Sequence, residues 1–148
     1  LSEPGVFDVA PVQRAVARAA SQRPGDITIL IAPTGVARCA AEALRRADYA
    51  LLAVEPSARG LRGLRALAGL ARDTLSRRVG VAMVGAGAHN ADMETFCREH
   101  NLPILLRFDD AETLRAAWTQ DAPLAADRPE LGAAFAALAE RLAEEAAR

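Results

Sequence analysis

The chain has 148 residues, a mass of 15.6 kDa and a net charge of −1, with 51% hydrophobic and 25% charged residues. This length and composition are typical of a single globular domain that buries roughly 70% of its unfolded surface. No apolar run approaches the roughly 20 residues needed to cross a bilayer, and no secretory signal is recognisable. We therefore expect a cytoplasmic protein without a membrane span.

The basic residues are informative because all 18 of them are Arg. Without Lys, this chain cannot supply the lysine of a phosphate-binding loop, a Schiff-base lysine or a lysine general base. Residues 1–75 carry 10 Arg and 7 acidic residues, and the remainder carries 8 and 12. Neither half is basic enough to indicate a nucleic-acid surface, so no nucleic acid is expected as a partner.

The two cysteines, Cys39 and Cys97, are too few for a disulfide framework or a four-thiolate metal site within one chain. We expect both thiols to be reduced and predict no metal site. A cluster shared between two subunits is the alternative that the count leaves open.

The chain alternates predicted helices and predicted buried strands. Apolar runs without polar alternation predict strands buried on both faces at 27–33, 49–54, 79–84 and 102–106. Apolar residues at helical spacing predict helices at 11–22, 36–47, 61–71, 90–100, from Asp109 or Asp110 onward, and at 130–147. A polar linker at about 121–129 precedes the last helix.

Strands that alternate with helices of this length predict a parallel sheet with right-handed crossovers. We therefore predict a single α/β domain over residues 1–148, a Rossmann-like three-layer sandwich with a parallel sheet of about four strands flanked by helices. Ligand-facing turns then lie at the carboxyl ends of the strands, at 33–37, 55–60, 85–90 and 107–111.

Helix N-termini attract anions through free N–H groups, so the acidic residues already present decide which turns remain open to phosphate. The last two turns are not expected to bind phosphate, because side chains of the chain itself supply the hydrogen-bond acceptors and negative charge there. Asn90 is predicted to cap the helix that follows it, with Asp92 and Glu94 in the first turn, and Asp109 and Glu112 do the same for the next helix.

The first two turns lack such acids in their opening helical residues. Thr34, Gly35 and Arg38 offer a hydroxyl, a close-approach glycine and a cation, and Ser57 and Arg59 offer similar groups one strand later. Anion binding between these two turns is the predicted site. The structural alternative is that the hydroxyls only cap helices.

Other polar residues each carry a functional and a structural interpretation. Glu55, at a strand end, is a candidate base or magnesium ligand, or else a partner of Arg38 or Arg59. His89 has no nearby nucleophile, so a catalytic triad is not supported and no catalytic residue is predicted. A row of arginines on the third helix forms either a solvated face or a docking surface for an acidic partner: Arg59, Arg62, Arg65 and Arg72.

The order of short motifs resembles the MinD/ParA-like P-loop ATPases, especially the branch with an inserted ferredoxin domain. In that family a strand ends in Asp-x-Pro-Pro-Gly, a Cys follows, and then come Ala-Asp, a strand ending Thr-Glu-Pro-Thr, and Gly-Leu. The corresponding pieces here are Ala32-Pro33-Thr34-Gly35, Cys39, Ala47-Asp48, Val54-Glu55-Pro56-Ser57 and Gly60-Leu61. The resemblance covers roughly residues 10–147 and implies the same fold.

The departures from the family pattern concern its chemistry. The phosphate loop with its two lysines is not present in this chain, Ile31 stands where the family has an Asp that organises magnesium and water, and the base-binding Asn near Val84 or Gly85 is missing. The cysteines of the inserted ferredoxin are missing too. Phosphoryl transfer depends on lysine and magnesium, so hydrolysis by this chain alone is not expected.

The resemblance and its departures leave three functions open. The first is a degenerate, non-hydrolysing MinD/ParA-like domain that acts as an interaction or regulatory module, with an iron–sulfur or redox protein or a second copy as partner. The second is the nucleotide-binding half of an ATPase, binding ATP or ADP, whose phosphate loop lies outside this chain. The third is a small anion- or phosphate-binding module.

Overall fold

The computed structural model describes residues 10–22, 27–32, 38–75, 78–110, 112 and 129–147. Its centre is a parallel sheet of three strands, β1 (Ala50–Val54), β2 (Val79–Val84) and β3 (Ile104–Phe108), in the order β1-β2-β3. The strands alternate with helices, which confirms the predicted α/β Rossmann-like sandwich. The strand count within the described residues is three rather than the expected four or so.

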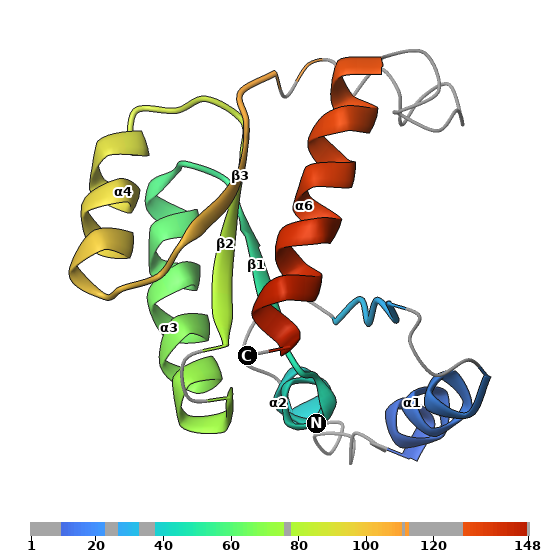
Figure 1. Cartoon of the computed structure of the whole chain (residues 1–148). Helices are drawn as coiled ribbons and strands as arrows, with labels where there is room; N and C mark the ends of the chain where they lie inside the picture. The colour runs from blue at the N-terminus through green and yellow to red at the C-terminus, as the bar shows by residue number, and fades with distance from the viewer. Residues whose placement is uncertain are drawn as a thin grey trace.

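Helices cover both faces of this sheet (Figure 1). α3 (Ala58–Leu75) and α4 (Asn90–Glu99) lie on one face, and α6 (Pro129–Ala147) lies on the other. The shorter helices α1 (Ala10–Gln22) and α2 (Arg38–Arg46) come first in the chain. Arg141 of α6 donates a hydrogen bond to the carbonyl of Leu105 at 3.1 Å, which fixes this helix against β3.

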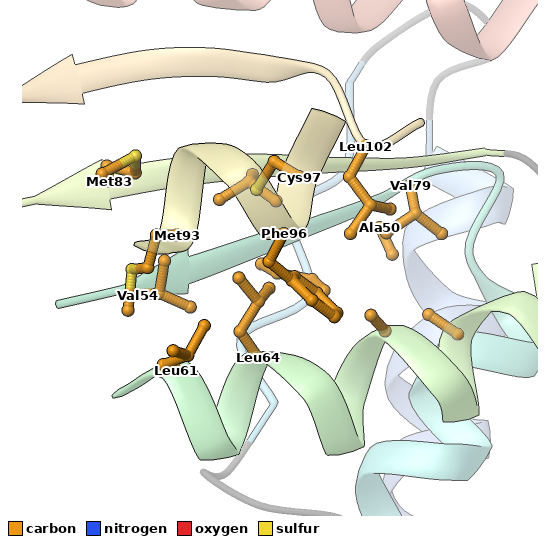
Figure 2. Packing of buried hydrophobic residues seen from close by; sticks show 14 residues of the cluster. Ala50, Val54, Leu61, Leu64, Val79, Met83, Met93, Phe96, Cys97 and Leu102 are labelled. Carbon is orange, nitrogen blue, oxygen red and sulfur yellow. The ribbon is translucent and has the colours of Figure 1, made fainter. Parts of the chain in front are cut away.

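The hydrophobic core lies between the sheet and the α3–α4 layer (Figure 2). The burial pattern of β1 alternates, with Ala50, Leu52 and Val54 buried toward this core. β2 is central and is buried along nearly its whole length. Both results follow from sheet order, because only a central strand has neighbours on each side as well as layers above and below.

The register between β2 and β3 contains one irregularity. Val81 pairs with Ile104, but Ala82 pairs with Leu106, so one residue of β3 is skipped. The amide of Val81 donates to the carbonyl of Pro103 at 2.9 Å. Pro103 cannot itself donate, which explains why the strand predicted at 102–106 begins two residues later.

A buried acidic residue joins the first two helices. Glu42 accepts hydrogen bonds from Gln13 of α1 at 3.1 Å, and from Arg45 and Arg46 of its own helix at 3.2 and 3.3 Å. The hydrogen bond from Gln13 is the largest cause that lowers the pKa of Glu42; burial opposes it and the two arginines add to it. These partners explain how a carboxylate is accommodated where α2 meets α1.

The prediction of a strand at 27–33 is wrong for residues 27–32, the part of it that the structure describes. Residues 27–32 form neither strand nor helix, and Ile27, Ile29 and Ile31 are 58%, 80% and 94% exposed. An apolar, β-branched run predicts burial only if another strand pairs with it, and here none does among the described residues. The helix predicted from Asp109 or Asp110 lies outside the described residues, apart from the helical Glu112.

Candidate functional site

The turns that follow β1 and β2 lie against each other at the carboxyl edge of the sheet. A Cβ atom on Gly87 would come within 2.1 Å of the carbonyl oxygen of Pro56, so only glycine permits this approach. The amide of Gly85 donates to the carbonyl of Phe108, which joins the second turn to the end of β3 at 2.5 Å. The edge therefore brings three predicted ligand-facing turns together.

The turn after β1 contains three of the predicted site residues. The hydroxyl of Ser57 accepts a hydrogen bond from the amide of Gly60 at 3.0 Å, and the amide of Ser57 donates to the carbonyl of Glu55 at 2.8 Å. Ser57 thus acts as the N-cap of α3. The side chains of Glu55 and Arg59 are exposed, and no ion pair joins the two.

The turn that was predicted to share the site is only partly visible. Thr34 and Gly35 lie outside the described residues, as does the side chain of Arg38, the first residue of α2. Anion binding between the two turns therefore stays a prediction. Its structural alternative, helix capping, accounts for the hydroxyl of Ser57.

We expect Ser57→Ala to lower the free energy of unfolding by about 1 kcal/mol, because the amide of Gly60 loses its acceptor. Ser57→Asn should retain most of the stability, since its side chain also caps helices. Urea unfolding of the three proteins measures both effects. Equal stability of the alanine variant and the parent would show that the cap contributes nothing.

The turn after β2 is arranged differently from its prediction. Asn90 is the first residue of α4 rather than its cap, His89 precedes the helix, and no side chain caps it. The Nδ1 atom of His89 lies 2.9 Å from a carboxylate oxygen of Asp92. The side-chain oxygen of Asn90 is buried without a hydrogen-bond partner in the described structure. Glu94 forms an ion pair with Arg107 of β3.

Two of the four arginines in the row on α3 contact the neighbouring α4 or the residue that follows it. Arg65 lies over the ring of Phe96 at 5.8 Å, and Arg72 donates to the carbonyl of His100 at the end of α4. Arg72 also lies 3.3 Å from the Nδ1 atom of the same histidine. These two arginines join α3 to α4, and all four arginines of the row are nevertheless exposed.

The cysteines give no indication of a metal centre in the described residues. Cys97 is a free thiol buried between α4 and the sheet, and burial raises its pKa. Within the same residues no group of three or more His, Cys, Asp or Glu side chains could hold a metal ion. The side chain of Cys39 lies outside the described part.

The feature that the sequence did not predict is the exposed segment 27–32. Of the large hydrophobic side chains exposed in the described structure, three belong to this segment, and the fourth is Phe135 of α6, at 40%. Hydrophobicity alone could not reveal this surface, because the same pattern predicts a buried strand. None of the described helices is long and apolar enough to span a membrane.

Comparison of the chain with protein-family models, with curated proteins and with solved structures gives no match.

Proposed function

We propose that this chain is a degenerate MinD/ParA-like α/β domain that works as a protein-interaction module and does not hydrolyse nucleotide. The observation that carries the proposal is the segment 27–32, where three isoleucines are 58–94% exposed. Exposed apolar side chains that are contiguous mark surfaces that bind other proteins. Lone exposed leucines or isoleucines are ordinary, but three in six residues are not.

The chemistry of the chain supports the second half of the proposal. Ile31 stands where the resembling ATPases carry a magnesium-organising Asp, and the chain has no Lys to position a phosphoryl group. The hydroxyl of Ser57, which lies where those ATPases have a threonine, is already used to cap α3. The chain therefore lacks the Asp and Lys on which phosphoryl transfer in those ATPases depends.

Anion binding is the competing function. α3 has no acidic residue in its first turn, and the side chain of Arg59 in that turn is exposed. A phosphate or nucleotide that bound there would raise the stability of the folded chain. At a concentration of 100 times Kd, the gain is about 2.7 kcal/mol.

Thermal unfolding with ATP and Mg²⁺, with ADP and with inorganic phosphate tests this choice. We expect no ligand to change the melting temperature and no phosphate to be released from ATP. A concentration-dependent rise with any of the three would favour the competing function, and release of phosphate from ATP would contradict the proposal.

Partner binding tests the interaction surface itself. Proteins cross-linked in cells to the wild-type chain, to Ile29→Glu and to Phe135→Glu are compared, and the partner lost only with Ile29→Glu is purified and titrated. We expect the wild type and the Phe135→Glu control to bind it alike and Ile29→Glu to bind at least about tenfold more weakly, because a charge must then enter an apolar contact. Equal binding by all three would overturn the proposed surface.

A further inference from the structure

The exposed segment 27–32 matches another unpaired feature of the same chain, the outer edge of β1. In the described sheet β1 pairs with β2 on one side only. The segment has six residues and β1 has five, and neither contains a charged residue or a proline. Figure 1 draws the segment as the light-blue stretch between α1 and α2, outside the sheet. Within the described residues the segment thus has no strand partner, and β1 has one on one side only.

The hydrogen bonds of β1 show which of its backbone groups remain open. The amide of Ala50 donates to the carbonyl of Arg78 at 2.9 Å, so the backbone of Ala50 faces β2. Because N–H and C=O groups alternate in direction along a strand, those of Leu51 and Ala53 point to the outer edge. The side chain of Ala53 is also exposed, and that of Leu51 is only partly buried.

The two edges of the sheet differ in how they are protected against pairing with a further strand. At the edge formed by β3, Arg107 is ion-paired with Glu94 of α4, and α6 is hydrogen-bonded to the carbonyl of Leu105. Charges at an edge discourage further strand pairing, whereas an uncharged edge invites it. β1 is therefore the edge that can accept another strand, and the uncharged segment 27–32 has the composition that such an edge accepts.

We propose that residues 27–32 of one chain add to the outer edge of β1 of a second copy, and that the second copy returns the same contact. This inference rests on the proposed function and names its partner. Reciprocal exchange is favoured because one chain carries both complementary surfaces, so a two-fold pair uses each surface once and closes. Strand addition gives main-chain hydrogen bonds for affinity and side-chain contacts for specificity. Each added strand would bury isoleucines that its own chain leaves exposed.

Sedimentation over a range of concentrations tests the pairing. We expect the wild type and Phe135→Glu to approach twice the chain mass of 15.6 kDa as concentration rises. Ile29→Glu should remain at the chain mass, because a carboxylate would be carried into an apolar edge. Ala53→Pro should do so as well, because it removes an outward N–H without removing a bond to β2. Circular dichroism checks that both variants are folded, and Ile29→Glu alone decides the result if the proline variant is not.

Cross-linking of mixed chains tests which two surfaces meet. In a Cys39→Ser background, one chain carries Ile29→Cys and another carries Ala53→Cys, while Cys97 remains buried. We expect a short bismaleimide to link the mixture into dimers at least about fivefold more than either chain alone. A third chain carries both cysteines. Cross-linking within this chain, with none between the two single-cysteine chains, would overturn the exchange between copies.

The outcomes separate this inference from the function on which it rests. A wild type that stays at the chain mass at every concentration overturns the exchange, as does a dimer that Ile29→Glu leaves intact. If that monomer still binds a different protein through Ile29, the proposed interaction function stands and only the second copy is wrong. If neither form of binding depends on Ile29, both proposals fall.

Discussion

We expect Leu64→Ala to lower the free energy of unfolding by about 2–5 kcal/mol. Leu64 is 0% exposed and points from α3 into the core, near Leu61, Met93 and Phe96 (Figure 2). Truncation removes the transfer free energy of three buried carbons and leaves a cavity between α3 and α4 that these neighbours fill only in part. For a domain of this size the loss is a large fraction of the total stability.

Leu70→Ala on the same helix is the matched control for this substitution. Leu70 is partly exposed and does not belong to the core cluster, so its truncation should cost about 1 kcal/mol or less. Urea unfolding of the two variants, followed by circular dichroism, gives the difference. Similar losses for both would mean that the α3–α4 layer closes around the missing side chain of Leu64.

Elements whose sequence pattern matches their burial were predictable. The apolar spacing of α3 predicted a stripe of Leu61, Leu64, Leu67 and Leu70 or Ala71, of which Leu61, Leu64 and Ala71 are buried and Leu67 and Leu70 are partly buried. The strand predicted at 79–84 is β2 with the same bounds, and the one at 49–54 is β1 without its first residue. The positions of these elements were predictable because apolar runs and helical apolar spacing mark segments that pack against a core. The predicted burial on both faces holds for β2 but not for β1, where Ala53 is exposed.

The exposure of segment 27–32 could not be predicted, because it depends on residues outside the segment. Its isoleucines indicate that burial would stabilise the run, but they do not indicate which element would cover it. Pairing of a strand depends on a neighbour that is distant in sequence, and in the described structure β1 pairs only with β2. An apolar run such as 27–32 can therefore be a buried strand or an exposed binding surface, and its composition is the same in both cases.

The sequence left two roles open for Ser57 and predicted the wrong cap for α4. The hydroxyl of Ser57 was expected either to bind an anion or to cap α3, and the cap is what the structure shows. Asn90 was expected to cap α4, yet it is the first helical residue. A one-residue difference at a helix start changes which side chain meets the free amides, and local sequence seldom fixes that boundary.

We expect Gly60→Ala and Gly63→Ala to change stability in opposite directions, although both lie in α3. Alanine favours a helix over glycine in each case, which is worth about 0.4–1 kcal/mol. At Gly63 nothing lies within 4 Å of the added methyl group, so this gain should appear in full. At Gly60 the methyl group would be 2.0 Å from the carbonyl oxygen of Glu55 and 3.1 Å from the Cε atom of Met93.

The clash at Gly60 involves the backbone and cannot be relieved by turning a side chain. The turn after β1 must move by about an ångström, since real Cβ contacts are rarely closer than 3.0 Å. That movement also disturbs the bond from the amide of Gly60 to Ser57. Overpacking of this kind costs about 1–3 kcal/mol, which exceeds the gain in helix propensity. Urea unfolding should therefore rank Gly63→Ala above the wild type and Gly60→Ala below it; a stabilised Gly60→Ala would mean that the turn between β1 and α3 yields freely and is not held at the sheet edge.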